Sequence, residues 1–265
     1  MTRRPRLVAT DLDGTLLRSD GTVSDRSVRA LRAVAAAGVE TVLVTARPPR
    51  WLDELAHVVG VRGIAVCGNG AFRYDVAEQR VFAERTIEPE LLAEVVADLR
   101  RELPGTGFAA ERAGGLAAER MFAAIHDHPE DLVCTHRIEE LGDERAGKLL
   151  ARNPHLTDDE FLVAAGEVVA DRLVLSYSGA GGLAEMSAPG VTKASALRAW
   201  CAELEIDAQD VWAFGDMPND LPMLRFAGRA FAVANAHPAV AALADESVAS
   251  NDDDGVAATL ERLLR

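Results

Sequence analysis

Residues 7–15 have the sequence LVATDLDGT, a short apolar run that is followed directly by two aspartates two positions apart. A short apolar run bounded by turn-forming residues is typical of a buried strand. Because ligands of open α/β sheets bind outside the carboxyl ends of the strands, Asp11 and Asp13 are expected at a ligand site. The two carboxylates would repel each other unless a cation or a shared proton intervened, and oxygen ligands suit magnesium. Taken alone, the stretch would equally suit a solvated surface turn.

The segments around this stretch alternate between strand and helix patterns. A strand is expected over 6–10, and Ser24 is suited to cap a helix that ends near Gly38. A second strand over 39–44 then predicts a parallel pair with a right-handed crossover. The same patterns predict the following further elements: helices over 52–59, 88–101, 193–204, 221–226 and 256–264, strands over 63–67, 211–214 and 230–233, and a hairpin over 72–82.

The middle of the chain has a different texture. Residues 103–118 are glycine-rich and poorly periodic, and they predict no regular element. Short apolar pairs at 168–169 and 173–175 suggest strands. We therefore expect a separate α+β unit that is inserted into the first domain.

Three more segments place polar residues after an expected strand or at the start of an expected helix. In GDMPND at 215–220, Asp216 would lie at a strand tip and Asp220 in the first helical turn, where a helix N-terminus stabilises a carboxylate. Thr45 offers a hydroxyl and nearby backbone N–H groups to a phosphate. Lys193 would offset the carboxylates and bind a phosphate oxygen. Taken alone, each of these three segments could equally be an ordinary turn, helix cap or surface residue.

In order along the chain, these segments resemble the four motifs of the haloacid dehalogenase-like superfamily, and specifically of its Cof-type phosphatases. The resemblance covers about 6–80 and 183–265. The matching segments are DLDGTL at 11–16, VTAR at 44–47, Lys193, GDMPND at 215–220, CGNGA at 67–71, VANA at 233–236 and SNDDDGV at 250–256. The family usually has glycine where this chain has Ala46, and the departure leaves Thr45 intact.

The resemblance implies an α/β fold with a doubly wound, mostly parallel Rossmann-like core. The core would comprise residues 1–82 and 183–265, and a mobile α+β cap of the C2 type would comprise 83–182. It also implies a Mg²⁺-dependent phosphatase that hydrolyses a small phosphorylated metabolite, either a phosphosugar or a phosphorylated cofactor. The substrate would sit between core and cap, and an aspartyl-phosphate would form during the reaction.

The roles of the acidic residues also follow from the resemblance. Asp11 would be the nucleophile, and Asp13 would protonate the leaving oxygen and then activate water. The metal would be held by Asp11, by the backbone carbonyl of Asp13 and by Asp216. Asp220 would act behind these ligands by orienting waters or Lys193.

The phosphate group would be held by four residues of this chain. The positive charge of Lys193 is important in this set, because a carboxylate attacks a phosphate dianion poorly unless a nearby cation reduces the repulsion. The residues that the resemblance assigns to phosphate are Thr45, Ala46, Lys193 and Asn219.

Composition and charge narrow the possible binding partners and the cellular compartment of the protein. The chain has 265 residues and a formal charge of −14, which disfavours nucleic acid and anionic membranes as partners. Its three cysteines form no CxxC pair, which favours a reducing compartment. No signal peptide or membrane span is apparent, so we expect a cytoplasmic protein. The sequence does not indicate the oligomeric state.

Two other functions and two other metal sites compete with this interpretation. A phosphomutase or phosphotransferase would use the same scaffold, and a non-catalytic binding domain would keep the fold alone. Irregular spacing disfavours a transition-metal site formed by His126, Asp127, His128, Cys134 and His136. Residues 252–254 are three aspartates without the pattern of an EF-hand, which favours helix capping and solvation over calcium.

Overall fold

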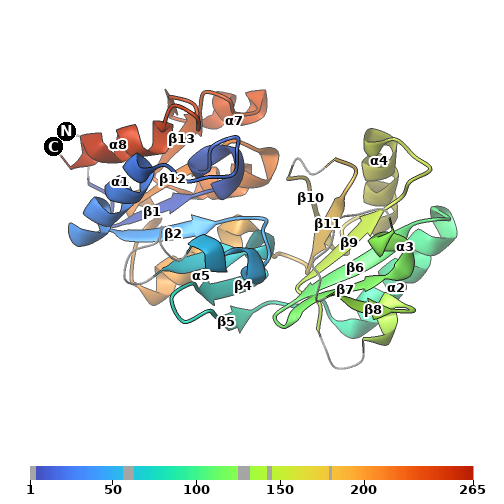
Figure 1. Cartoon of the computed structure of the whole chain (residues 1–265). Helices are drawn as coiled ribbons and strands as arrows, with labels where there is room; N and C mark the ends of the chain where they lie inside the picture. The colour runs from blue at the N-terminus through green and yellow to red at the C-terminus, as the bar shows by residue number, and fades with distance from the viewer. Residues whose placement is uncertain (1–3, 56–62, 125–131, 142–144, 179–180, 265) are drawn as a thin grey trace. The chain divides into compact units, whose positions relative to one another are not determined.

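The computed structural model describes residues 4–55, 63–124, 132–141, 145–178 and 181–264. The chain forms two compact units, one of Met1–Ala83 with Thr192–Arg265 and one of Glu84–Val191 (Figure 1). None of the helices in the described ranges has the length and apolar character needed to cross a membrane.

The first unit is built on an eight-stranded sheet of order β14-β13-β12-β1-β2-β3-β4-β5. The six strands from β14 to β3 are parallel, and β4 runs antiparallel to β3. The strands are β1 Leu7–Thr10, β2 Glu40–Val44, β3 Ile64–Cys67, β4 Phe72–Asp75, β5 Arg80–Glu84, β12 Val211–Gly215, β13 Arg229–Val233 and β14 Glu246–Val248.

The strand order reverses between β1 and β12. From β1 the chain continues outward through β2 and β3, whereas β12, β13 and β14 extend in the opposite direction. Open α/β sheets bind ligands at such a switch point, outside the carboxyl ends of the strands. The mostly parallel, doubly wound core expected from the sequence is confirmed.

Helices cover this sheet on its two faces. Apolar residues of α5, α6 and α7 pack with Leu7, Ala9 and Val42 in one core cluster. Helices α1 and α8 contact each other, and α1 also contacts β2. The bounds are α1 Asp25–Ala36, α5 Lys193–Glu203, α6 Leu221–Phe226, α7 Pro238–Leu243 and α8 Gly255–Leu263.

Local sequence signals explain several element boundaries in this unit. The hydroxyl of Ser24 accepts a hydrogen bond from the backbone N–H of Ser27, so the predicted N-cap is confirmed. For 52–59 the structure has a short 3₁₀ turn at Asp53–Leu55, and 56–59 lie outside the described residues. Asp254 precedes α8, but its carboxylate pairs with Arg18 and makes no capping hydrogen bond.

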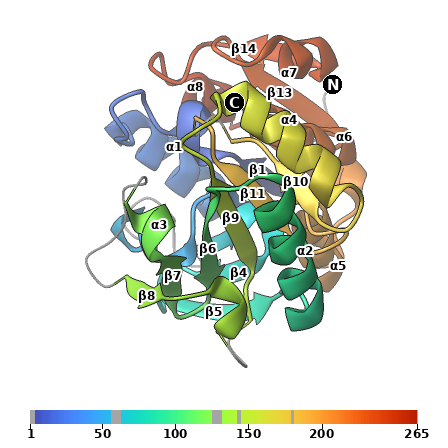
Figure 2. The same cartoon turned by 90° about the vertical axis from the view of Figure 1, so that its right-hand side faces the viewer.

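The second unit has a six-stranded sheet of order β10-β11-β9-β6-β7-β8, which is antiparallel except for the β7–β8 pair. Two long helices, α2 and α4, contact each other (Figure 2). The elements are α2 Pro89–Glu102, β6 Gly107–Arg112, β7 Gly115–Glu119, α3 Arg120–Ala123, β8 Val133–Thr135, β9 Lys148–Arg152, α4 Asp158–Val169, β10 Val174–Ser176 and β11 Ala184–Ser187.

Three features of this unit differ from the sequence prediction. β6 and β7 occupy most of the stretch 103–118, where no element was expected, because all of β6 is buried and it shows no alternation of apolar and polar residues. Residues 168–169 end helix α4 instead of forming a strand, since Thr157 opens that helix with a capping box. The chain returns to the first unit at Thr192 and not at 183, because β11 pairs with β9 and β10.

Candidate active site

Two of the predicted acidic residues lie side by side at the switch point of the first sheet. Asp11 follows β1 and Asp216 follows β12, and these strands are parallel neighbours in which Thr10 lies opposite Phe214. The backbone N–H of Asp11 donates to the carbonyl of Phe214 at 3.0 Å, which extends the pairing to the end of the strand. Both side chains are buried.

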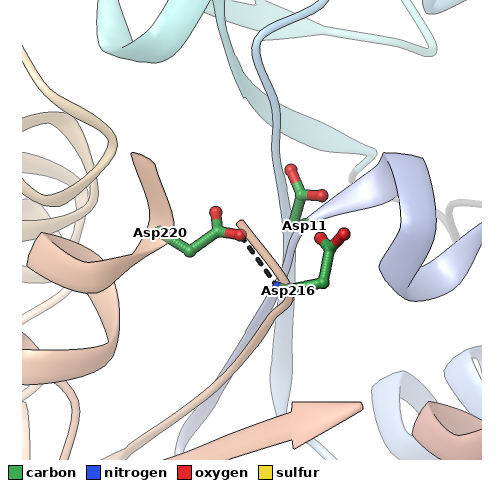
Figure 3. Close-up of side chains that lie close together, drawn as sticks. All are labelled: Asp11, Asp216 and Asp220. Atoms are coloured by element: carbon green, nitrogen blue, oxygen red, sulfur yellow. Dashed lines mark hydrogen bonds between the residues drawn. The ribbon is translucent and has the colours of Figure 1, made fainter. Parts of the chain in front are cut away.

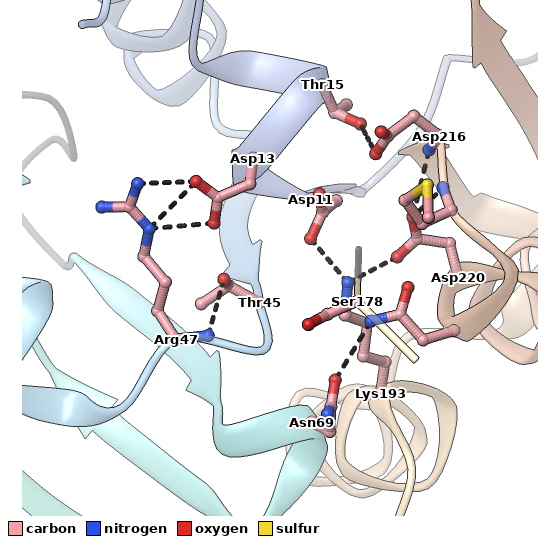
Figure 4. Close-up of polar contacts among 12 residues, drawn as sticks. Asp11, Asp13, Thr15, Thr45, Arg47, Asn69, Ser178, Lys193, Asp216 and Asp220 are labelled. Carbon is pink, nitrogen blue, oxygen red and sulfur yellow. Dashed lines mark hydrogen bonds and ion pairs between the residues drawn. The ribbon is translucent and has the colours of Figure 1, made fainter. Parts of the chain in front are cut away.

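Lys193 joins the first aspartate to the last one. Its Nζ donates to Asp11 Oδ1 at 2.5 Å and to Asp220 Oδ1 at 2.6 Å (Figure 4). The lysine is the first residue of α5, and the side chain of Thr192 caps this helix by accepting from the N–H of Ser195. Lys193 is 2% exposed, and the carboxylates of Asp11 and Asp220 hold its ammonium in place.

Asp220 has no exposed surface and supports the loop after β12. Its Oδ2 accepts a hydrogen bond from the backbone N–H of Asp216 at 3.0 Å (Figure 3). The same oxygen accepts a second one from the backbone N–H of Met217 at 3.1 Å. Its Oδ1 is taken by Lys193. Both oxygens therefore already have donors from the chain, which suits a carboxylate that positions its neighbours.

The carboxylate of Asp216 lies so close to Gly14 that no side chain would fit at that position. Its Oδ1 accepts the hydroxyl of Thr15 at 2.8 Å. A Cβ placed on Gly14 would come to 2.4 Å from Asp216 Oδ2, and Gly14 has a φ of +76°. The glycine of the DLDGT stretch is thus required both by the turn and by the close approach of this carboxylate.

The charges of this cluster do not balance. Ligand oxygens of Asp11, Asp216 and Asp220 lie within 4.8 Å of one another, and one ammonium, that of Lys193, pairs with two of these carboxylates. Buried carboxylates in excess of their cations are costly. An all-oxygen donor set with excess negative charge fits a magnesium ion. The described residues hold no other group of three or more converging acidic, histidine or cysteine ligands.

The pKa values of the cluster reflect this crowding. Burial raises the pKa of Asp11 well above its usual value, against the positive charge of Lys193 and together with the other aspartates. Burial also raises the pKa of Asp216 to about 6, although the hydrogen bond from Thr15 opposes the rise. Burial alone would lower the pKa of Lys193, but the charges of Asp11 and Asp220 outweigh it, so the net pKa is raised.

Asp13 lies apart from the cluster. Arg47 donates from Nε to both carboxylate oxygens of Asp13, at 3.1 and 2.9 Å, and from Nη2 to Oδ1 at 2.6 Å (Figure 4). About half of the Asp13 side chain is exposed. The sequence analysis assigns no role to Arg47. The feature that could have indicated one is its positive charge in the VTAR segment, close to the predicted aspartates.

Of the four predicted phosphate-binding residues, Lys193 begins α5, and the other three follow β2 or β12. Thr45 is buried directly after β2, and its hydroxyl oxygen accepts the backbone N–H of Arg47 at 3.0 Å, which leaves the hydroxyl proton for another acceptor. Ala46 is half-buried beside it. Asn219 donates to Asn69 Oδ1 at 3.2 Å, while its own buried Oδ1 has no hydrogen-bond partner. An orphaned buried amide oxygen indicates that a ligand or water completes the site.

The competing metal sites receive little support. Cys134 and His136 are exposed, and residues 126–128, which include Asp127, lie outside the described residues. The acidic run 252–254 is used within the chain. Its three carboxylates bond to Ser19, to Ser250 and to Arg18 respectively.

Comparisons with known proteins agree with this fold. A family model described as haloacid dehalogenase-like hydrolase matches residues 8–260. The chain is 27% identical to the 5-amino-6-(5-phospho-D-ribitylamino)uracil phosphatase YitU of Bacillus subtilis, over 98% of each chain. It is 28% identical to a phosphoglycolate phosphatase of Methanopyrus kandleri, over 97% of each chain.

Solved structures show the same architecture. SMU.1108c from Streptococcus mutans matches with a TM-score of 0.82 and 24% identity, over 98% of this chain and 99% of that one. BT1666 from Bacteroides thetaiotaomicron, which is described among phosphatases of the haloalkanoate superfamily, also matches with a TM-score of 0.82 and 24% identity, over 98% and 95% of the two chains. At this identity the structural matches establish the fold alone.

Proposed function

The chain belongs to the haloacid dehalogenase-like hydrolase family, and on this basis we propose that it is a magnesium-dependent phosphatase of small phosphorylated metabolites that works through a phosphorylated Asp11. The observation that carries the proposal is the convergence of Asp11, Asp216 and Lys193 at the switch point of the sheet. The relatives named for phosphoribitylaminouracil and phosphoglycolate phosphatase activity support a small phosphomonoester as substrate.

Asp11 is the residue best suited to attack phosphorus. It lies at the end of β1 beside the ammonium of Lys193. In the first step, an Oδ of Asp11 would form a bond to phosphorus while the bond from phosphorus to the leaving oxygen breaks. Lys193 would reduce the repulsion between the carboxylate and the phosphate dianion, and the hydroxyl of Thr45 would donate to a phosphate oxygen.

Asp13 would move the protons of both steps. It would give a proton to the leaving oxygen in the first step and take one from the attacking water in the second. Water would then break the bond between phosphorus and Asp11, which regenerates the carboxylate and releases inorganic phosphate. Because Arg47 holds the Asp13 carboxylate, this ion pair has to open before Asp13 carries out either transfer.

Magnesium would be held by Asp11, Asp216 and the backbone carbonyl of Asp13, and when bound it would offset charge on the phosphoryl group. The cluster of Asp11, Asp216 and Asp220 supports this choice, because its oxygen atoms carry excess negative charge. Asp220 would stay behind the ligands and fix Lys193 and the loop at Asp216, while Asn219 would contribute to binding the substrate phosphate.

Hydrolysis of an aryl phosphate tests the proposal. We expect phosphate release with Mg²⁺, none with a chelator, and none in Asp11→Ala. Asp253→Ala is the matched control, because it removes an exposed aspartate outside the site. Metal-independent release, or full activity in Asp11→Ala, would contradict the mechanism. A panel of phosphorylated metabolites would then identify the substrate, and transfer to a second hydroxyl in place of water would reveal a phosphotransferase.

A further inference from the structure

A charged cavity lies in the first unit at the amino ends of β12, β13 and β14, whereas the candidate active site lies at the carboxyl ends of the strands. The cavity has a volume of about 270 Å³. Residues of β12, β13, β14 and α8 line it together with Arg4, and the full set is Arg4, Trp212, Arg229, Phe231, Glu246, Thr259, Arg262 and Leu263. Trp212 precedes Asp216 by four residues along β12, which corresponds to about 13 Å of strand. The cavity is therefore separate from the candidate active site.

Positive charge is in excess in this cavity. Three arginines and one glutamate line it. Glu246 divides its two oxygens between Arg229 and Arg262, so one carboxylate faces two guanidinium groups. The guanidinium of Arg4 donates to the carbonyl of Ala37 and pairs with no acidic side chain in the described part of the chain. The cavity therefore carries an excess of two positive charges, in a protein with a formal charge of −14.

One of the three arginines, Arg229, is also preorganised. Arg229 lies over the rings of Trp212 and Phe231, at 5.3 and 5.1 Å from their centroids. Both rings are buried, and the register of the strands places Trp212 opposite Arg229 and Phe231 opposite Glu246. A guanidinium held flat by cation–π contact and by an ion pair loses little freedom when it binds an anion. The arginine fork matches the oxygens of a phosphate group.

We infer that this cavity, lined by Arg4, Arg229 and Arg262, is a second binding site that takes a small, multiply charged oxyanion such as a phosphate group. The guanidinium of Arg229 lies over both rings, so the cavity offers an anion mainly charged groups and the site selects charge over shape. The inference does not depend on the proposed catalytic function, since none of these residues lies in the cluster around Asp11.

Equilibrium dialysis with radiolabelled inorganic phosphate, at low ionic strength and with a chelator, tests this inference. We expect binding that persists in Lys193→Met, which alters the candidate active site. Arg262→Gln and Arg4→Gln should each weaken this binding about tenfold, as expected for the loss of one charge-assisted contact. Arg26→Gln is the matched control, because Arg26 pairs with Glu261 of α8 but does not line the cavity.

Three outcomes would overturn the inference. They are phosphate binding that disappears in Lys193→Met and is unchanged in Arg262→Gln, equal weakening in Arg26→Gln and Arg262→Gln, and no binding by any variant. Circular dichroism shows whether each variant folds. If Lys193→Met does not fold, the comparison of Arg262→Gln and Arg4→Gln with Arg26→Gln still decides the result.

Discussion

Arg47 holds the carboxylate of Asp13 through three hydrogen bonds, at a position outside the buried aspartate cluster. The two residues come from neighbouring strands, since Asp13 follows β1 and Arg47 follows β2. A carboxylate in this arrangement accepts hydrogen bonds and has no proton aimed at a leaving group. The pair therefore separates the proposed acid from the proposed nucleophile until Asp13 turns away from Arg47.

Replacement of Asp13 tests its role in proton transfer. Asp13→Asn should lower kcat by about 10²–10⁴, the usual contribution of general acid–base catalysis. The loss should be larger for an alkyl phosphate than for an aryl phosphate, because an alkoxide leaving group needs its proton more. Steady-state rates with both substrates measure this, and an unaltered kcat would rule the role out.

Replacement of Arg47 tests whether the pair opens easily. Its side chains are 24% and 53% exposed, and exposed ion pairs contribute about 0–1 kcal/mol. Arg47→Gln should therefore lower the free energy of unfolding by at most about 1 kcal/mol, and it should cost nothing further in an Asp13→Ala background. Urea unfolding of the two single variants and the double variant gives this cycle. A loss of several kcal/mol would mark the pair as a fixed structural contact.

Replacement of Lys193 tests the charge balance of the cluster. Lys193→Met leaves Asp11 and Asp220 without their shared cation, and breaking a buried pair in this way costs about 3–5 kcal/mol. Because burial raises the pKa of Asp11, this carboxylate takes up a proton more readily than a free one, so the cost should become smaller as the pH is lowered.

The matched control for Lys193 is a buried lysine of the second unit. Lys148 pairs with Glu185 at 3.3 Å, so Lys148→Met should also destabilise the protein, while hydrolysis of an aryl phosphate should persist. Loss of activity in Lys193→Met alone would separate catalysis from stability. Equal activity in the two variants would contradict the role of Lys193.

Two glycines with similar backbone angles distinguish strain from crowding. Gly14 and Gly38 have φ values of +76° and +79°, but a Cβ would meet Asp216 only at Gly14. Gly38→Ala should cost about 1–2 kcal/mol through backbone strain and leave the stabilisation by Mg²⁺ intact. Gly14→Ala should also abolish the rise in melting temperature on adding Mg²⁺. Equal Mg²⁺ effects in both variants would show that Asp216 is not a ligand.

The raised pKa of Asp216 predicts how stability depends on pH without metal. Burial raises this pKa from 3.8 to about 6, so the folded protein binds more protons than the unfolded chain between these values. Stability contributed by the protonated group is present below pH 4 and is lost as pH rises through 6. The loss is about 3 kcal/mol, from roughly two pH units at about 1.4 kcal/mol each.

Urea unfolding from pH 4 to pH 7 in a chelator measures this effect. The difference between the wild-type protein and Asp216→Asn should change across the window, and Mg²⁺ should restore the lost stability above pH 6, since metal and proton compete for the carboxylate. A constant difference across the window would show that Asp216 titrates normally.

The sequence was informative where backbone order alone decides position. Asp11 and Asp216 could be placed together because the carboxyl ends of parallel strands meet at one edge, and each aspartate directly follows an apolar run. Ser24 and the helix from Lys193 could be predicted because capping and helical periodicity act within a few residues. These signals are local, and tertiary contacts reinforce them.

Other features could not be predicted because they depend on partners far apart in the chain. The strands β6 and β7 show no alternation, since almost all of their residues are buried, and β11 joins the second sheet through pairing with β9 and β10. The arginine cavity gathers Arg4, Arg229 and Arg262 from distant segments. No short sequence motif predicts a cavity that is formed by residues so far apart in the chain.

The sequence by itself determined which residues stand at the strand ends, because the order of apolar runs and turns fixes the topology of a parallel sheet. Only the tertiary structure decided where their side chains point. Asp13 lies two residues from Asp11, yet its carboxylate bonds to Arg47 while Asp11 bonds to Lys193. Rotamers and long-range charge pairs set this choice, and neither is recorded in the spacing of residues along the chain.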